Sequence, residues 1–505
     1  MLFLAPLVLL TSAIQAPDQT DSKGAPATDS MAPKAAGPMA LEDEIIVRSH
    51  NLQLASGGLD FTSRTGRLVL RTEEGEDRAA IFFTAYEASP EQDRADRPLT
   101  FCFNGGPGSS SVWLHLGAFG PYRVDLGTEG LDLEGGRPVI PNLHTLLPTT
   151  DLVFLDPVTT GYSRAAEGVD DSQFHGDRRD VESVADFIRL YLTRHERWAS
   201  PIYLAGESYG TTRAAALSLH LETRHGIYPR GLILVSSILN FQTARFDVGN
   251  DLPYPLFLPT YAAIAHYHGR LDERFADLGA LLDEVEQFAA GEYTSALFRG
   301  DALTQAERAA LAARIASYTG LSSQYVEETN LRPHIQRFVK ELRREEGLTV
   351  GRLDGRYTGV DRDNAGDSVE FDPSYAAIQG PYTMGLNDYV RRTLGFQSDL
   401  PYEILTGRVR PWSYERAENS YLNVAEDLRG AMARNPNLRV YIANGLYDLA
   451  TPYFATRYTF DHLGLPEDRR ADIISSDFAA GHMMYVKESE LEKLASELVE
   501  FLTAP

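Results

Sequence analysis

Short runs of apolar residues recur along the first half of the chain, each bounded by residues typical of turns. The runs cover residues 99–103, 152–155, 202–206 and 232–236. Continuous apolar runs of this length are typical of strands buried on both faces of a largely parallel sheet. Between them, apolar side chains at helical spacing predict helices over 177–198 and 211–225. Strands alternating with crossover helices predict an α/β fold.

The pattern changes between residues 246 and 420. Residues 278–290 and 304–318 are rich in Ala, Leu, Glu and Arg, with the periodicity of amphipathic helices. A Gly- and Asp-rich irregular stretch follows at 351–366. We interpret 246–420 as a largely helical cap inserted into the α/β fold.

The strand pattern returns after this insertion. Apolar runs at 439–444 and 472–475 predict two more strands, and leucines at helical spacing predict a final helix over 488–502. The predicted core therefore has a first part, 43–245, and a C-terminal part, 421–505. A large insertion also fits the length of 505 residues, because a single hydrophobic core stops growing at roughly 250–300 residues.

The N-terminus has the pattern of a targeting segment. Residues 1–10 are largely apolar and too few to span a bilayer, and small residues with a plausible cleavage site follow at 13–16. We predict a signal peptide at 1–16, although no Lys or Arg precedes the apolar run. Residues 17–42 have the composition of a flexible linker. The expected location is secreted or periplasmic, with no stable membrane span.

Charge and cysteine content exclude several classes of protein. The formal net charge of −24 argues against a nucleic-acid partner. The single cysteine, Cys102, allows neither an intramolecular disulfide nor a cysteine metal cage. A secreted protein without disulfides fits a bacterial envelope better than a cysteine-rich eukaryotic secretion. No H-E-x-x-H motif or Cys/His cluster is present, so we expect neither metal nor cofactor.

The sharpest chemical signal is the sequence Gly-Glu-Ser-Tyr-Gly at 206–210. It follows a predicted strand and precedes a predicted helix, which is the setting of the nucleophile elbow of α/β-hydrolases. The elbow would present Ser208 at a helix N-terminus, where backbone N–H groups can receive negative charge. We therefore predict an α/β-hydrolase fold with Ser208 as the nucleophile.

A nucleophilic serine needs a histidine base and an orienting carboxylate. In this fold they follow the serine in the order acid, then histidine. Asp448 lies on a loop after the predicted strand 439–444, and His482 follows the next predicted strand. The weaker candidates lie in a helical stretch or too close to His482 in the chain: His462, Asp472 and Asp477.

A second motif follows the strand at 99–103. The sequence Asn-Gly-Gly-Pro-Gly-Ser-Ser-Ser at 104–111 allows the backbone to approach closely and to point an N–H at a developing oxyanion. The N–H of Tyr209, the residue after the nucleophile, is the other expected donor. A simple tight turn is the alternative interpretation. The motif is not a phosphate loop, because it lacks the lysine of one.

Together these motifs resemble the serine carboxypeptidases, peptidase family S10. The matching stretches span the predicted core in the family's order and lie at 104–111 with 120–121, 155–163, 206–210, 444–448 and 481–483. The resemblance implies release of single amino acids from peptide C-termini through an acyl-enzyme. It implies Ser208 as nucleophile, His482 as base and then acid, and Asp448 as its partner.

The resemblance also implies a binding site. Gly106 and Tyr209 would form the oxyanion hole. The substrate's terminal carboxylate would be bound at Asn104, Gly105 and Glu207. Such binding requires Glu207 to be protonated, because a pair of carboxylates must share a proton. An acidic pH optimum for peptides is therefore expected.

Two positions depart from the family pattern. Ala118 stands where the family usually has a second glutamate, two residues before Gly120-Pro121. Ser109 stands where many relatives have a disulfide cysteine. The missing glutamate favours an alternative, an esterase or acyltransferase with the same triad. A third hypothesis is a catalytically inactive binding protein. The presence of Ser208, Asp448 and His482 argues against it.

Overall fold

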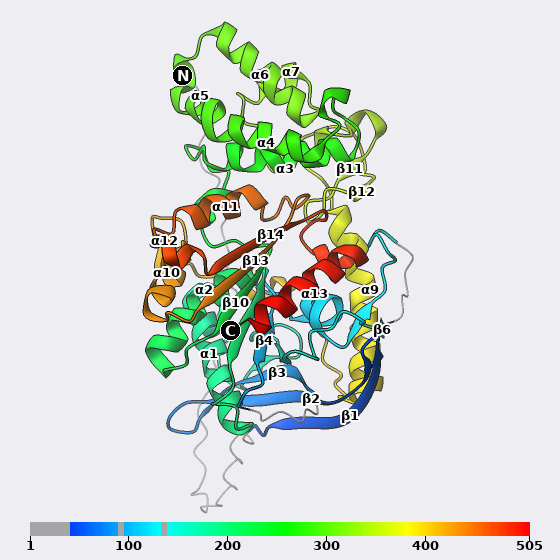
Figure 1. Ribbon diagram of the computed structural model, residues 1–505, viewed down its shortest axis with the longest axis vertical. Helices are drawn as coiled ribbons and strands as arrows, with labels where there is room; N and C mark the ends of the chain where they lie inside the picture. Colours follow the sequence, from blue (N-terminus) through cyan, green and yellow to red (C-terminus); the bar gives the residue numbers. More distant parts are fainter. Residues whose placement is uncertain (1–40, 89–94, 133–138, 505) are drawn as a thin grey trace, which may run out of the picture. The chain divides into compact units, whose positions relative to one another are not determined.

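One mixed β-sheet organises the computed structural model, which describes residues 41–88, 95–132 and 139–504 (Figure 1). The predicted signal peptide and nearly all of the predicted linker lie outside these residues. Within them, the strand order is β1-β2-β3-β7-β4-β9-β10-β13-β14, with the short β8 paired to β3. The bounds are β1 Glu44–Leu54, β2 Gly57–Arg71, β3 Asp77–Ala88, β4 Leu99–Phe103, β7 Asp151–Leu155, β8 Arg164–Ala165, β9 Ile202–Glu207, β10 Gly231–Val235, β13 Arg439–Gly445 and β14 Ile473–Phe478.

The sheet has an antiparallel edge and a parallel centre. Strands β1, β2, β3 and β7 pair antiparallel in succession. From β7 to β14 every pairing is parallel. The four apolar runs predicted as strands in the first half of the chain are β4, β7, β9 and β10. Because these strands run parallel, their carboxyl ends meet at one edge of the sheet, where the predicted site residues follow.

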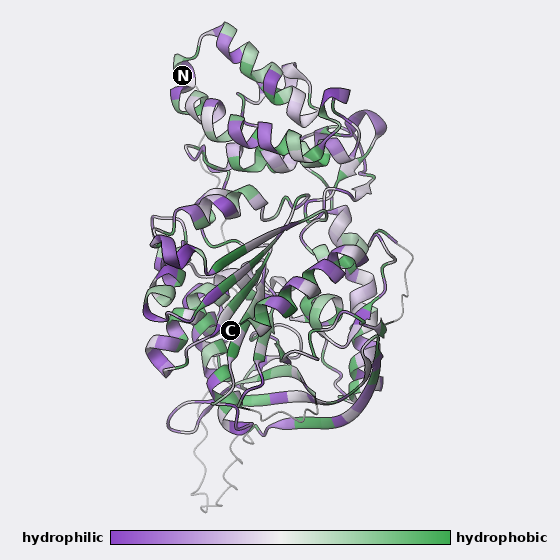
Figure 2. Cartoon of the chain, viewed as in Figure 1, coloured by the Kyte–Doolittle hydropathy of each residue, from purple (hydrophilic) through white to green (hydrophobic). Residues whose placement is uncertain are grey.

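The parallel strands are buried on both faces, and alternate residues serve different cores. In β9, Tyr203 and Ala205 belong to one apolar cluster, whereas Ile202 and Leu204 belong to another. This division follows from the two-residue period of a strand. Figure 2 shows the hydrophobic colours on these strands and more hydrophilic positions on the outer helices. We call the two sides the HC-A face, with Tyr203, and the HC-B face, with Ile202.

Helices cover the two faces. On the HC-B face lie α1 (Asp177–Arg194), α2 (Tyr209–His220) and α10 (Ala425–Arg434). On the HC-A face lie α13 (Glu488–Thr503) and a π-helical segment, Leu114–Phe119. The predicted helix 177–198 ends early, at Arg194. The helix predicted at 211–225 begins at Tyr209 and continues beyond His220 as a π-helical turn, Leu221–His225.

The predicted insertion divides in the structure. Its helices α3 to α8, coloured green in Figure 1, build a third apolar cluster, which also includes Tyr447, Leu449 and Tyr453 from the segment after β13. Helix α9 (Pro373–Tyr389) instead adds Tyr382 and Leu386 to the cluster of the HC-A face. The boundaries 246 and 420 stay a prediction. The helices are α3 Pro253–Tyr267, α4 Leu278–Phe288, α5 Thr294–Arg299, α6 Gln305–Thr319, α7 Ser323–Glu328 and α8 Ile335–Glu341.

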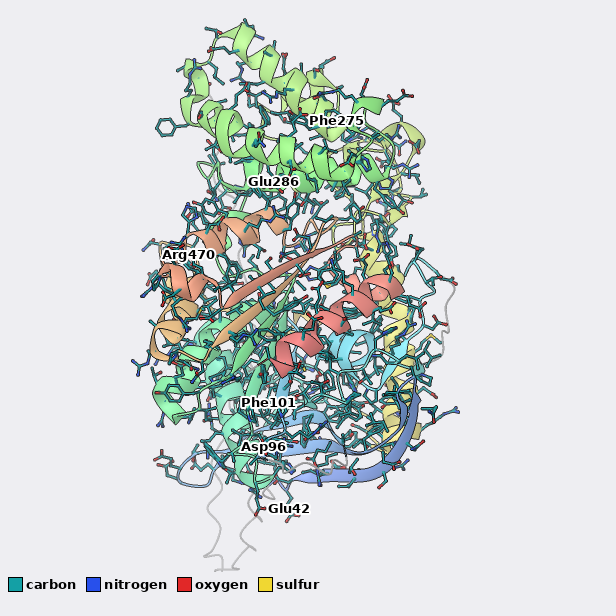
Figure 3. All side chains as sticks on the ribbon, in the orientation of Figure 1. Glu42, Asp96, Phe101, Phe275, Glu286 and Arg470 are labelled. Carbon is teal, nitrogen blue, oxygen red and sulfur yellow. The ribbon has the colours of Figure 1, made fainter. Side chains whose placement is uncertain are left out.

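A partly buried polar contact also joins the inserted helices to the core. Glu286 on α4, labelled in Figure 3, accepts a hydrogen bond from the Tyr453 hydroxyl at 2.8 Å and pairs with Arg457 at 2.9 Å. Both partners belong to α11 (Tyr453–Asp461), which follows Asp448 in the chain. Smaller elements complete the described fold: α12 Glu467–Arg470, β5 Tyr122–Val124, β6 Val139–Pro141, β11 Thr349–Val350 and β12 Thr358–Gly359.

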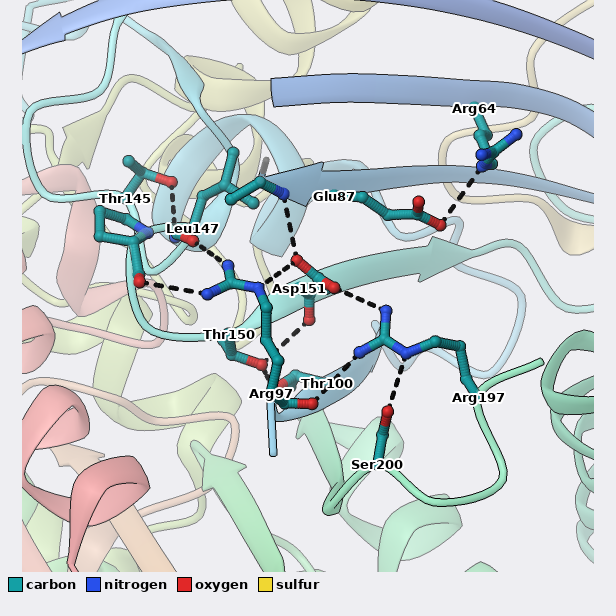
Figure 4. A network of polar contacts seen from close by, with 12 residues as sticks. Arg64, Glu87, Arg97, Thr100, Thr145, Leu147, Thr150, Asp151, Arg197 and Ser200 are labelled. Carbon is teal, nitrogen blue, oxygen red and sulfur yellow. Dashed lines mark hydrogen bonds and ion pairs between the residues drawn. The ribbon is translucent and has the colours of Figure 1, made fainter. Parts of the chain in front are cut away.

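A buried cluster of ion pairs lies at the start of strand β7, at the end of the sheet opposite the predicted site residues (Figure 4). Asp151, the first residue of β7, pairs with Arg97 at 2.7 Å and with Arg197 at 2.6 Å. All three side chains are at most 4% exposed. Arg97 also donates to the Leu147 carbonyl, and Arg197 donates to Ser200. The cluster ties the start of β7 to the segments that precede β4 and β9. Among the described residues, no helix is long and apolar enough to cross a membrane.

Candidate active site

Ser208 occupies a sharp turn between β9 and α2. Its φ of 59° and ψ of −127° lie where residues other than glycine are strained, as at many functional sites. Its N–H donates to the Val235 carbonyl at 3.0 Å. A Cβ on Gly206 would lie 2.2 Å from the Gly210 carbonyl oxygen. The glycines at 206 and 210 therefore permit the close turn that the motif predicts.

Asp448 and His482 are brought together from two loops. Asp448 follows β13 and His482 follows β14. His482 Nδ1 lies 2.7 Å from Asp448 Oδ2, and Asp448 is fully buried while His482 is 5% exposed. The Thr451 hydroxyl donates to the same carboxylate oxygen at 2.7 Å, and the Ala450 N–H donates to Oδ1 at 2.7 Å. These bonds fix the carboxylate against Nδ1 of His482, and Nε2 has no hydrogen-bond partner among the described residues.

The backbone at His482 is fixed by two further segments. Its N–H donates to the Leu353 carbonyl at 2.7 Å, and its carbonyl accepts from the Ser236 hydroxyl at 2.6 Å. The preceding Gly481 N–H donates to Asp354 at 3.1 Å. A Cβ on Gly481 would lie 2.4 Å from Asp354 Cβ. The inserted stretch therefore holds the histidine loop directly.

The charge of Asp448 controls the pKa of His482. Burial lowers the pKa of His482, but the Asp448 carboxylate, its hydrogen bond and the nearby Glu207 raise it by more. The net pKa lies above the ordinary value of 6.5. Among the described residues no hydrogen bond joins Ser208 to the His482 ring, although both line one cavity. Catalytic hydrogen bonds are often long before substrate binds.

The glycine-rich turn packs directly on the elbow. A Cβ on Gly105 would lie 2.4 Å from the Tyr209 nitrogen, and Gly106 has φ +102°, a conformation that favours glycine. Arg213, paired with the buried Asp180 at 2.7 Å, donates to the Asn104 carbonyl at 2.6 Å. The described chain offers no acceptor to the N–H groups of Gly106 and Tyr209. Both lie beside Ser208, which suits an oxyanion hole.

The run 155–163 supports this turn. Asp156 is buried and accepts hydrogen bonds from the Ser111 N–H and hydroxyl, both at 2.8 Å. Burial raises the pKa of Asp156 to about 6, against the opposing effect of these bonds. A Cβ on Gly161 would lie 1.7 Å from the Asp156 carboxylate. These residues therefore position the glycine-rich turn from behind.

Glu207 is a buried carboxyl beside the nucleophile. It is 3% exposed, and its Oε2 accepts a hydrogen bond from the Tyr485 hydroxyl at 2.6 Å. Burial raises the pKa of Glu207 to about 7, although His482 and Tyr485 act to lower it. The Asn104 amide also lowers this pKa, yet its buried Nδ2 meets no partner at hydrogen-bonding geometry within the described residues. An unpaired donor and a protonatable acid thus lie side by side.

One cavity of about 560 Å³ unites most of these groups. Its lining includes Gly105, Gly106, Glu207, Ser208, Tyr209 and His482. Asn104 is buried behind the lining. Ala118 is also buried, in the apolar cluster of the HC-A face. The weaker sequence candidates pair elsewhere: Asp472 with Arg469 at 2.9 Å, Asp477 with Arg457 at 2.5 Å and His462 with the Tyr458 carbonyl at 2.7 Å.

Several residues of the site were not predicted from the sequence motifs. Thr451 follows Asp448 by three residues and could have been found from that spacing. Tyr485, the Leu353 carbonyl and the cavity-lining Arg245, Arg352 and Arg410 carry no local signal. Tyr485 lies two residues beyond the matching stretch 481–483, and the others lie in segments outside the matching stretches. The cavity is therefore better defined by the tertiary structure than by the sequence.

Comparison with known proteins agrees with this geometry. The family model described as "Serine carboxypeptidase" matches residues 55–496. Serine carboxypeptidase-like 16 of Arabidopsis thaliana is 27% identical over 201 residues, 37% of this chain and 43% of that protein. Pheromone-processing carboxypeptidase KEX1 of Saccharomyces cerevisiae is 32% identical over 155 residues, 28% of this chain and 20% of that protein. These matches span less than half the length of either relative.

Structural comparison shows the fold. The crystal structure of KEX1(delta)p, a prohormone-processing carboxypeptidase from S. cerevisiae, superposes with a TM-score of 0.53 at 17% identity, covering 88% of this chain and 91% of that chain. The predicted α/β-hydrolase fold is confirmed. By the match to residues 55–496, the chain belongs to the serine carboxypeptidase family.

Proposed function

We propose that this protein is a serine carboxypeptidase that hydrolyses the last peptide bond of a peptide through an acyl-enzyme on Ser208. One observation carries the proposal. Glu207, buried with a pKa of about 7, lies next to Ser208 in the cavity that also contains His482. A site that only cleaved esters would need the nucleophile and base, but not an acid poised to bind a carboxylate.

The proposed chemistry follows from the hydrogen bonds. Asp448 holds His482 by Nδ1, so Nε2 accepts the Ser208 proton as the hydroxyl oxygen attacks the carbonyl carbon. The Gly106 and Tyr209 N–H groups stabilise the resulting oxyanion. His482 then gives its proton to the leaving amine, and the carbon–nitrogen bond breaks. Water, deprotonated by His482, hydrolyses the acyl-enzyme and regenerates Ser208.

Recognition of the free C-terminus is assigned to Asn104, Gly105 and Glu207. A neutral Glu207 donates a hydrogen bond to the substrate carboxylate, whereas an ionised one would repel it. The unpaired Asn104 Nδ2 is a second donor beside it. Tyr485 holds Glu207 Oε2 and thereby leaves Oε1 to carry the proton toward the substrate. In this chain Tyr485 supports Glu207 without a second glutamate, which Ala118 replaces.

Amino-acid release tests the proposal. N-blocked dipeptides with a free carboxylate, the same dipeptides amidated, and an aryl ester are assayed between about pH 4 and 8, the range that brackets the two titrating groups. We expect release from the free acids that is abolished in Ser208→Ala, with little release from the amides. Fluorophosphonate labelling of Ser208 reports an active nucleophile independently.

Other outcomes reassign the protein. Ester cleavage without peptide release would indicate an esterase or acyltransferase, with Ala118→Glu as the first substitution to make. Neither hydrolysis nor labelling of Ser208 would indicate an inactive binding protein.

We also propose export, to a periplasm or the medium, as in a bacterial member of the family. The support is the apolar run at 1–10 with the plausible cleavage site at 13–16, and the presence of one cysteine in the sequence. Fractionation of expressing cells, with the N-terminus of the mature protein determined by mass spectrometry, tests it. Uncleaved protein retained in the cytoplasm would contradict it.

A further inference from the structure

The cavity carries a charge opposite to that of the chain. The chain has 71 acidic and 47 basic residues, yet the cavity lining contains one carboxylate, Glu207, and three arginines: Arg245, Arg352 and Arg410. Because burial raises the pKa of Glu207 to about 7, that group is largely neutral in weak acid. The cavity is therefore cationic within a strongly anionic protein.

These three arginines are exposed and have no carboxylate partner within 4 Å in the described part of the chain. Arg408, two residues from Arg410, contrasts with them, because it pairs with Asp171 at 3.6 Å and Glu403 at 3.5 Å. The charges of the lining arginines are therefore not neutralised by an ion pair, although Arg245 lies close enough to the Tyr414 hydroxyl to hydrogen-bond with it. Guanidinium binds carboxylates in a planar, two-point geometry, so an anionic substrate group is the complement they lack.

Two of the arginines share one wall of the cavity. The Arg245 guanidinium lies 5.7 Å from the centre of the Phe241 ring, and the Phe241 and Tyr414 rings are 5.9 Å apart. Arg245, Arg410 and Tyr414 line the same cavity. Burial raises the pKa of Tyr414, whereas the charges of both arginines lower it. We call these four residues, Phe241, Arg245, Arg410 and Tyr414, the arginine wall.

The arginine wall and Glu207 lie on opposite sides of the elbow. Phe241 belongs to the HC-B face and contacts the Tyr209 ring, with ring centres 6.5 Å apart. Glu207 lies on the other side of the elbow, against Tyr485 of the HC-A face. If Glu207 holds the carboxylate of the leaving residue, the residue whose carbonyl Ser208 attacks extends toward the arginine wall.

We propose that the arginine wall selects peptides whose penultimate residue is aspartate or glutamate. The proposal rests on the function proposed above, because that function defines which side of Ser208 is the acyl side. An acidic side chain there would meet two cations, whereas a neutral side chain of the same shape would meet only the Phe241 and Tyr414 rings. Selection would be weakened by salt, because both cations are exposed.

The test compares side chains of equal shape. N-blocked Glu-Leu, Gln-Leu and Lys-Leu dipeptides are assayed beside the aryl esters of N-blocked Glu, Gln and Lys. We expect kcat/KM for Glu to exceed that for Gln about tenfold at low salt, the size of a hydrogen-bonded charge contact that is partly exposed. Lys is expected to be the poorest of the three, and 0.5 M salt to reduce the Glu-to-Gln ratio.

Variants assign the preference to the wall. Arg245→Gln and Arg410→Gln should each lower the Glu-to-Gln ratio several-fold, and the double variant should bring it close to one. Arg408→Gln removes the same charge from the same loop outside the cavity and should keep the wild-type ratio. A wild-type ratio of one or less overturns the proposal. A ratio that falls in Arg352→Gln, whose charge acts on His482, but not in the wall variants also overturns the proposal.

The ester series separates this proposal from the proposed function. An aryl ester has no C-terminal carboxylate, so it measures selection on the acyl side alone. A preference for Glu among esters, without cleavage of dipeptides, would support the arginine wall and contradict the carboxypeptidase. Cleavage of dipeptides with equal rates for Glu and Gln would support the carboxypeptidase and contradict the arginine wall.

Discussion

At the scale of single residues, neighbours in the chain have opposite surroundings. Ser208 reaches the cavity through a strained turn, whereas Glu207, one residue earlier, points into the HC-A face and bonds to Tyr485. Strand alternation places Glu207 on the side of Tyr203 and Ala205, whereas the direction of Ser208 is set by the turn that follows the strand. The nucleophile is thus accessible while its neighbour is desolvated enough to remain protonated near neutrality.

The titration of Glu207 gives the first prediction. In the wild type, kcat/KM for free-acid dipeptides should fall as the pH rises through about 7, where Glu207 becomes ionised and repels the substrate carboxylate. Glu207→Gln stays neutral, so this fall should disappear, with activity at pH 6 within about tenfold of wild type because an amide still donates a hydrogen bond. If kcat/KM of the variant fell with pH as in the wild type, Glu207 would not be the group whose ionisation causes the fall. The aryl ester, which lacks the carboxylate, is the matched control.

Tyr485 gives the second prediction. Its hydrogen bond lowers the pKa of Glu207, so Tyr485→Phe should raise that pKa and move the alkaline fall to higher pH, by up to about one unit. KM for free-acid dipeptides should also rise several-fold, because the carboxyl loses its fixed orientation. Values of kcat for the ester should change little. A profile identical to wild type would show that Tyr485 does not position Glu207.

At the scale of elements, strand ends are held by charges and strand centres by apolar contacts. The parallel strands bury apolar residues on both faces. For this reason the four apolar runs that form β4, β7, β9 and β10 could be predicted as strands from the sequence. Helix ends were less predictable: α1 stops at Arg194, before the predicted residue 198. The chain there turns to place Arg197 against Asp151, and such a long-range ion pair has no local sequence signal.

Asp151 gives the third prediction. Asp151→Asn leaves Arg97 and Arg197 without a buried counter-charge, and breaking a buried pair in this way costs about 3–5 kcal/mol. The free energy of unfolding in urea should fall by that amount. Asp186→Asn removes a carboxylate whose pair with Arg78 is about one third exposed, and it should change stability by less than about 1 kcal/mol. Equal losses in the two variants would contradict the role of burial.

At the scale of the whole molecule, the inserted stretch completes the site that the core begins. Leu353 and Asp354 hold the backbone at His482 and Gly481, and Arg352 lines the cavity. Helix α4 is joined to α11 through Glu286. The position of the histidine therefore depends on contacts from the inserted stretch as well as from the core.

Gly481 gives the fourth prediction. An alanine there would meet Asp354 Cβ at 2.4 Å, so Gly481→Ala should displace the histidine loop and lower kcat for peptide and ester alike, by about tenfold or more. Gly430→Ala on α10 is the control, because its Cβ would meet only Leu219 side-chain atoms, at 3.4 Å and beyond. That control should keep full kcat and gain up to about 1 kcal/mol in stability. Full kcat in Gly481→Ala would contradict the inference that packing against Asp354 positions the histidine loop.

The sequence alone determined the α/β class, the nucleophile elbow and the candidates Asp448 and His482. Each depends on local turn chemistry and on the order of motifs along the chain, which a single sequence displays. Only the tertiary structure decided which side chains surround them. Tyr485 meets Glu207 across 278 positions, and Leu353 meets His482 through a backbone carbonyl. Such contacts arise where distant segments pack together, and packing leaves no periodic or local pattern in the residues that make it.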